Sequence, residues 1–293
     1  MKRIVFSAAL AALASFVASN AEAKTWHKMN GTCATSISAA DGLSPWAIGC
    51  TNGDSAGDLP ILFTTPIQYN VAAGTSSWNQ VLGAARWVSA ATQTNQAAPN
   101  VYVWVVQNSG AVFKGLLTSG TNVTWTEEMG PGSATTVSVN PSYVINSAYF
   151  TTYTPGNGGY GFRGFTEGHE VTVYPGAGAS FAVTENEDML WATGETNGAY
   201  FMKRFGEWVQ EGNFTRASFG TIAPVTPAAG CVGGCDGGAA YTVGTDGDIH
   251  YWNGKVWSST GFPTRQASQV SGAYGTSNVA WALDTSGVIW TYQ

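Results

Sequence analysis

Residues 241–257 read YTVGTDGDIHYWNGKVW, and this stretch decides the fold. An apolar strand opens on Tyr241, an Asp-Gly turn leads to a second strand, and an Asn-Gly turn leads to a third strand that carries Trp257. Tight hairpin turns need positive φ angles, which Gly, Asn and Asp tolerate, so both dipeptides are strong hairpin signals. The stretch therefore predicts three consecutive antiparallel strands.

The same unit recurs down the whole chain. Each copy opens on an aromatic residue and has a Gly six or seven positions later, at 46–53, 104–110, 191–198, 241–247 and 281–287, and a looser copy begins at Phe150. A third strand with an aromatic residue follows, and then a fourth apolar strand, as at 137–139 and 181–183. Four short strands every ~40 to 50 residues are typical of a β-propeller blade.

The two ends of the chain hold complementary halves of one unit. The last copy, at 281–293, stops after its second strand, while residues 24–29 resemble a third strand and residues 35–38 can supply the fourth. A blade built from both termini closes the ring and removes open sheet edges. We therefore predict an all-β fold: one propeller over residues 24–293, closed by joining the N- and C-terminal strands. It has six four-stranded blades, with five or seven as the alternatives.

The first 23 residues have the features of a secretory signal peptide. Lys2 and Arg3 precede an apolar run at 4–17, and the small-x-small sequence at 21–23 fits a cleavage site. Turn residues interrupt every later apolar run before it reaches the ~20 residues that a transmembrane helix requires. We expect the mature protein to be secreted or periplasmic, without membrane insertion.

The mature chain is acidic and poor in charge. Removal of Lys2, Arg3 and Glu22 leaves 10 basic and 17 acidic residues, a net charge of about −7. Affinity for nucleic acid comes largely from Lys and Arg that neutralise phosphates. This balance argues against nucleic acid as a partner. In the whole sequence, the 37 Gly beside 12 Trp, 12 Tyr and 13 Phe are typical of a rigid exported protein.

Four cysteines fall in the mature part of the chain. An even number in an exported protein favours disulfides, and we predict the pairs Cys33 with Cys50 and Cys231 with Cys235. A zinc site is the competing interpretation of the CVGGC sequence at 231–235, but it needs four ligands and the two halves lie far apart. We predict neither a metal nor a cofactor.

These repeats resemble those of the tectonin family of β-propeller lectins. Residues 241–257 closely resemble the tectonin pattern of a first strand, a DG turn, a second strand and an N-G-x-x-W segment. Residues 281–292 (WALDTSGVIWTY) resemble its first half, and the other four copies follow it in outline. The resemblance implies non-catalytic recognition of glycans, on a cell surface or a polysaccharide, at repeated shallow sites on the propeller.

A glycan site needs an aromatic platform beside a few fixed polar groups, because sugars present hydroxyls around an apolar ring face. At each position the alternative is that the ring packs inside a blade, since aromatic side chains dominate such cores. The candidate glycan-binding residues are Trp252, Asn253, Trp257, Asp246, Asp248, Trp208, Arg204, Trp125, Trp78 and Trp290.

An enzyme needs convergent ionisable groups, and the sequence clusters few of them. Its histidines, His27, His169 and His250, are scattered over three units, and the acidic runs at 167–170 and 185–188 suit solvated loops. The Asp246-Gly247-Asp248 turn lacks the further ligands of a Ca²⁺ loop. We rank a lectin first, a polysaccharide lyase or glycoside hydrolase second, and a protein-interaction propeller third.

Overall fold

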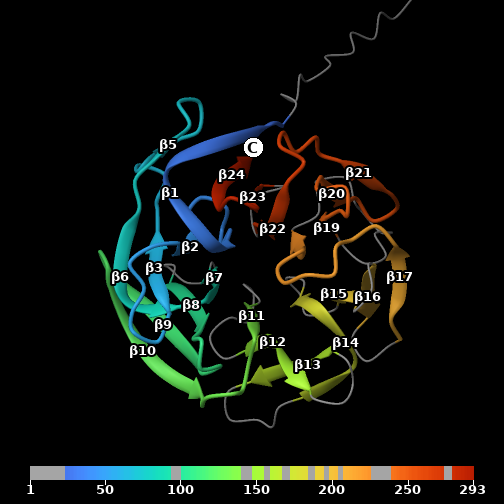
Figure 1. Cartoon of the computed structure of the whole chain (residues 1–293), viewed down its shortest axis with the longest axis horizontal. Helices are drawn as coiled ribbons and strands as arrows, with labels where there is room; N and C mark the ends of the chain where they lie inside the picture. The colour runs from blue at the N-terminus through green and yellow to red at the C-terminus, as the bar shows by residue number, and fades with distance from the viewer. Residues whose placement is uncertain are drawn as a thin grey trace, which may run out of the picture.

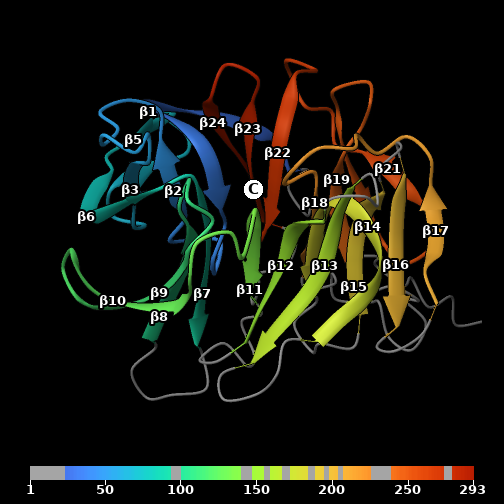
Figure 2. The ribbon, with the colours of Figure 1, turned by 60° about the horizontal axis from the view of Figure 1, so that its bottom comes forward.

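A computed structural model of the chain describes residues 24–93, 100–139, 147–154, 159–166, 172–183, 189–194, 198–203, 207–225, 239–273 and 279–293. Within these ranges every regular element is a β-strand, as the sequence predicts. Figure 1 shows the strands arranged in a ring around a common axis, and Figure 2 shows them standing side by side around it.

The described strands pair into six groups of four antiparallel strands. Two long strands, β1 (Trp26–Ser38) and β14 (Thr172–Val183), each belong to two groups, because the first half of the strand pairs with one neighbour and the second half pairs with another. From the axis outward, group 1 contains the second half of β1, β2 (Trp46–Gly49), β3 (Leu59–Phe63) and β6 (Asn79–Ala85), and group 2 contains β7 (Trp87–Gln93), β8 (Asn100–Val106), β9 (Val112–Ser119) and β10 (Asn122–Met129). In the same order, group 3 contains β11 (Thr136–Val139), β12 (Ser147–Thr154), β13 (Gly159–Thr166) and the first half of β14, and group 4 contains the second half of β14, β15 (Met189–Gly194), β16 (Ala199–Lys203) and β17 (Val209–Gly212). Group 5 contains β18 (Ile222–Val225), β19 (Ala239–Val243), β20 (Ile249–Trp252) and β21 (Trp257–Ser259), and group 6 contains β22 (Ala267–Gly272), β23 (Ala280–Asp284), β24 (Val288–Tyr292) and the first half of β1. A short hairpin, β4 (Tyr69–Asn70) and β5 (Thr75–Ser76), is inserted between β3 and β6.

Strand β1 joins the two ends of the chain. Its first half pairs antiparallel with β24, with Trp26 opposite Tyr292, which is the pairing expected for residues 24–29. The prediction for residues 35–38 is wrong, because the second half of β1 pairs with β2 and is the innermost strand of group 1. The sequence unit opens on the second strand of a group, so its fourth strand belongs to the next group.

The aromatic residues that open the repeats form the interior of the groups. All six side chains are at most 1 % exposed, on the second strand of each group: Trp46, Trp104, Phe150, Trp191, Tyr241 and Trp281. Their turns also behave as predicted, since Gly110, Gly247 and Gly287 have φ angles of 84°, 78° and 76°.

Serines on the innermost strands tie neighbouring groups together. Ser271 accepts a hydrogen bond from Ala39 N (2.9 Å), and Ser38 accepts one from Ala90 N (2.9 Å). Ser89 continues the pattern by accepting from Val139 N at 3.1 Å. Each hydroxyl satisfies an amide of the next group that has no strand beside it, at three successive junctions around the axis.

A disulfide fixes the middle of β1. Cys33 and Cys50 are bonded, with a Cα–Cα distance of 5.6 Å, as predicted. The other expected pair, Cys231 with Cys235, lies outside the described residues. The described chain also contains no helix long and apolar enough to cross a bilayer.

Candidate functional site

Outer-strand tryptophans connect groups 2, 5 and 6 to the group before each of them. The indole Nε1 of Trp125 on β10 donates to Leu82 O on β6 (2.7 Å), and that of Trp257 on β21 donates to Glu211 O on β17 (2.8 Å). Trp26 on β1 does the same to Thr260 Oγ1, which follows β21, at 3.0 Å. The recurring Trp therefore has a structural role, but Trp125 and Trp257 stay partly exposed.

The other predicted platforms differ in how much of the ring they leave open. Trp78 and Trp208 are partly buried, and Trp208 packs against Phe162 with ring centroids 5.6 Å apart. Trp252 and Trp290 are 5 % and 9 % exposed, so neither can offer a ring face to a sugar in this conformation.

The residues predicted within 241–257 do not converge on one point. Asp246 and Asp248 lie in the turn before β20, whereas Asn253 lies in the turn after it. The four residues of β20 separate these turns by about 13 Å at the usual rise per residue. The Asn253 side chain also caps its own turn, since Oδ1 accepts from Lys255 N and Val256 N at 3.0 Å each.

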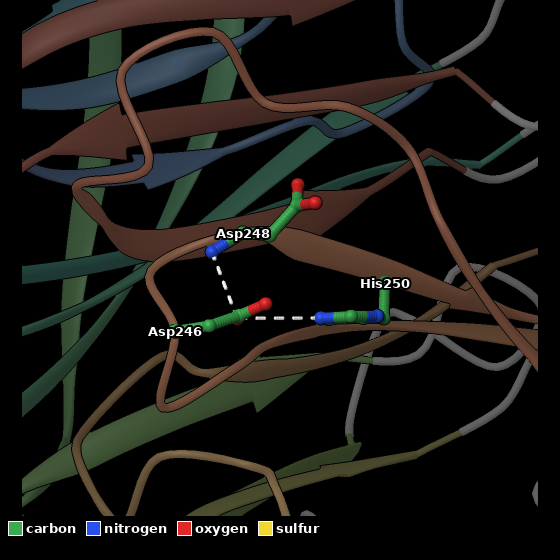
Figure 3. Close-up of side chains that lie close together, drawn as sticks. All are labelled: Asp246, Asp248 and His250. Carbon is green, nitrogen blue, oxygen red and sulfur yellow. Dashed lines mark hydrogen bonds and ion pairs between the residues drawn. The ribbon is translucent and has the colours of Figure 1, made fainter.

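Asp246, Asp248, His250 and Arg265 form a polar cluster, here called the turn cluster, and Figure 3 shows the first three of them. Asp246 Oδ1 accepts from Asp248 N at 3.1 Å and lies 3.3 Å from His250 Nε2. Gly244 leaves the space for this contact, because a Cβ there would lie 2.9 Å from His250 Nε2. The Arg265 guanidinium lies 3.7 Å from Asp246 and 3.9 Å from Asp248.

The two carboxylates of the turn cluster have different roles. Asp248 is 1 % exposed, and it accepts from Ile249 N and Phe262 N at 2.7 Å each and from Ser259 Oγ at 2.5 Å. Asp246 is half-exposed. Burial acts to raise the pKa of Asp246, but the hydrogen bonds from Asp248 N and His250 and the charge of Arg265 lower it overall.

This bonding decides what the turn cluster can hold. Three oxygen and nitrogen ligands lie within 4.8 Å of one another, which is close enough for a metal ion. Both Asp248 oxygens are already bonded, and Arg265 places a positive charge beside them. The cluster instead leaves Asp246, His250 and Arg265 able to exchange hydrogen bonds with a polar ligand.

One aromatic side chain, Phe214, lies directly beside the turn cluster and links it to Trp257. The ring of Phe214, from the segment after β17, is 4.8 Å from His250 and 5.7 Å from Trp257. The junction of groups 4 and 5 therefore joins two partly exposed aromatic rings to three accessible polar groups, and we call it the junction site: Phe214, Trp257, Asp246, His250 and Arg265.

Sequence reasoning found two of these five residues and missed the others as site residues. His250 follows Asp248 by two positions. Because side chains alternate between the two faces of an extended chain, the sequence alone could have placed His250 on the same face as Asp248. Phe214 and Arg265 come from other segments, and no local pattern connects them to Asp246. Arg204, the acidic runs and His169 lie outside the described residues.

A cavity of about 60 Å³ lies on the axis of the ring. All six innermost strands line it, with Ser38, Ser89, Ser138 and Ser271 among them, and Trp87 and Gly220 come from opposite groups. The described lining contains no Asp, Glu, His, Lys or Arg, so this part of the channel offers hydrogen bonds but no ionisable group.

No protein-family profile matches the sequence, and no curated protein matches it. Solved structures share its fold at low identity. A candidate gluconolactonase has a TM-score of 0.59 at 8 % identity, over 93 % of this chain and 92 % of its own. A variant of AofleA from Arthrobotrys oligospora, with three arginines changed to alanine, has a TM-score of 0.55 at 10 % identity, over 92 % and 85 %.

The β-propeller domain of Cps50 (Swd1) from Myceliophteria thermophila has a TM-score of 0.52 at 10 % identity, over 90 % of this chain and 97 % of its own. At such identities a likeness carries the fold and not the function. The chain is thus similar to β-propellers of several kinds.

Proposed function

We propose that this protein is an exported lectin, a six-bladed propeller in which the six strand groups are the blades and β1 with β24 closes the ring. It binds neutral or weakly charged glycans, without catalysis, at shallow sites between neighbouring groups. The junction site is the observation that carries this proposal, because it is where aromatic faces and accessible polar groups meet.

Two further features favour binding over turnover. The outer-strand tryptophans recur at three junctions between groups, as repeated binding sites require. The described lining of the axial cavity contains no ionisable group. The indole N–H of Trp257 is already bonded to Glu211 O, so a sugar contacts the ring face, and Asp246 and Arg265 supply the hydrogen bonds.

A glycan array on the mature protein tests this proposal. We expect binding to be weak at each site and strengthened by multivalent presentation, because shallow contacts leave much of the sugar in water. Asp246→Asn and Arg265→Ala should each reduce binding at least tenfold while lowering the melting temperature by no more than a few degrees. Lys255→Ala is the matched control, since Lys255 is exposed at the other end of β20.

Two results contradict the proposal. The first is glycan binding that survives both substitutions, which would move the site away from this junction. The second is release of reducing ends or unsaturated products from a polysaccharide panel, abolished by Glu170→Gln or Glu187→Gln, which would make the protein an enzyme.

A further inference from the structure

The inserted hairpin β4–β5 leaves its own group and docks on β1. Thr75 pairs in parallel with Asn30, and Figure 1 shows β5 beside β1. Both backbone groups of Asn30 are held: its N–H donates to Gly74 O at 2.8 Å, and its C=O accepts from Ser76 Oγ at 2.6 Å. Ser76 in turn accepts from Trp78 Nε1 at 3.0 Å, which ties the hairpin back to group 1.

The docking point is the place where β1 passes from one sheet to the other. The ladder between β1 and β24 shifts register between Met29 and Cys33, and Gly31 there has a φ of 120°. A Cβ at Gly31 would overlap Ser76 O, so the hairpin and this backbone bend fit each other closely. A bend at glycine between two strand halves is a natural hinge.

The hairpin also reaches the C-terminal side of the ring. The ring of Tyr69 packs edge-on against Trp281 of β23, with centroids 5.6 Å apart, and its hydroxyl bonds to the side chain of Gln293. Tyr69 and Trp78 pack against the buried cluster that contains Met29 and Ile289. One short insertion therefore contacts β1, β23 and the last residue of the chain.

These contacts add to the pairing with β24 and to the Trp26–Thr260 hydrogen bond, which also hold the first half of β1. Residues after the bend are anchored by the Cys33–Cys50 disulfide and by pairing with β2. Residues before it belong to another sheet and can separate from β24 without disturbing group 1. A released strand leaves the β24 edge unpaired, and the matching strand of a second copy fits that edge equally well.

We propose that the hairpin Tyr69–Ser76 is a clasp that keeps residues 26–29 paired with β24 of their own molecule and prevents strand exchange with a second copy of the chain. The proposal needs no particular function of the protein. The partner is a second copy because its own residues 26–29 carry the same side chains that pair with β24 here.

Replacement of residues 70–75 by Gly-Gly tests the clasp. After unfolding with the disulfide intact and refolding over a range of protein concentrations, we expect the fraction of dimer, measured by light scattering, to be at least tenfold higher than for the parent. Ala72→Ser is the control, because Ala72 is exposed in the hairpin turn. An unchanged dimer fraction overturns the proposal.

Ser76→Ala provides a second readout that keeps the whole hairpin. This change removes the bonds to Asn30 O and from Trp78, so we expect amide hydrogen exchange of residues 26–29 to accelerate at least tenfold. The amides of β23 should be much less affected. Equal exchange in parent and variant means that the clasp does not hold the strand, and it overturns the proposal even if the shortened hairpin fails to fold.

Discussion

Trp257 illustrates how one residue type serves both structure and recognition. Its N–H is bonded to the preceding group and its ring contacts Phe214, Trp191 and Trp252, so the indole cannot rotate. A fixed, partly exposed ring loses little conformational entropy when a ligand binds. The same fixation makes Trp257→Ala a poor test of binding, because loss of the ring also opens a cavity between the groups.

Asp246 gives the turn cluster a pH dependence. Its pKa is lowered in the fold, so its ionised form stabilises the protein above the unfolded pKa of about 3.9, and this contribution is lost as the pH falls through the folded pKa. Asp246→Asn should therefore lower the free energy of unfolding near pH 5, by less than about 1 kcal/mol because the group is half-exposed.

Urea unfolding of parent and variant at a series of pH values measures this difference. It should vanish towards about pH 2, where both states carry a protonated Asp246. A difference that grows as the pH falls would show that the carboxylate does not stabilise the fold in this way.

The innermost strands show how the groups are held at the axis. A strand with no neighbour on one edge leaves amides unpaired, and the serine of the preceding strand satisfies one of them at three junctions. Ser89→Ala should leave Val139 N without a partner and destabilise the protein by about 1–3 kcal/mol, the usual cost of a buried unsatisfied donor.

Thermal or denaturant unfolding measures the effect of Ser89→Ala. Ser258→Ala, exposed on β21, is the control and should change stability by less than about 0.5 kcal/mol. Equal stability of Ser89→Ala and the parent would mean that water replaces the hydroxyl in the axial cavity.

The elements were predictable from sequence where the signal is local. A Gly at positive φ marks the turns at Gly110, Gly247 and Gly287, and the buried aromatic residue follows from the repeat. The division of the strands into groups could not be predicted from local sequence, because only the strand pairing shows that residues 35–38 join β2 and not β24. The serine pattern was visible at 88–89 and 270–271, but its role depends on a neighbour about 50 residues away.

The whole molecule depends on contacts between its first and last described strands. β24 pairs with β23 on one side and with β1 on the other, so its removal unpairs two ladders and leaves Met29 and Trp26 without their covering strand. Deletion of residues 287–293 should abolish cooperative thermal unfolding. Deletion of Gln293 alone is the control, because it removes only the terminal bonds to Thr25 and the side-chain contacts with Thr291 and Tyr69, and it should lower the melting temperature slightly. A seven-residue truncation that melts like the parent would show that the ring does not need this strand, and the closure we propose would be wrong.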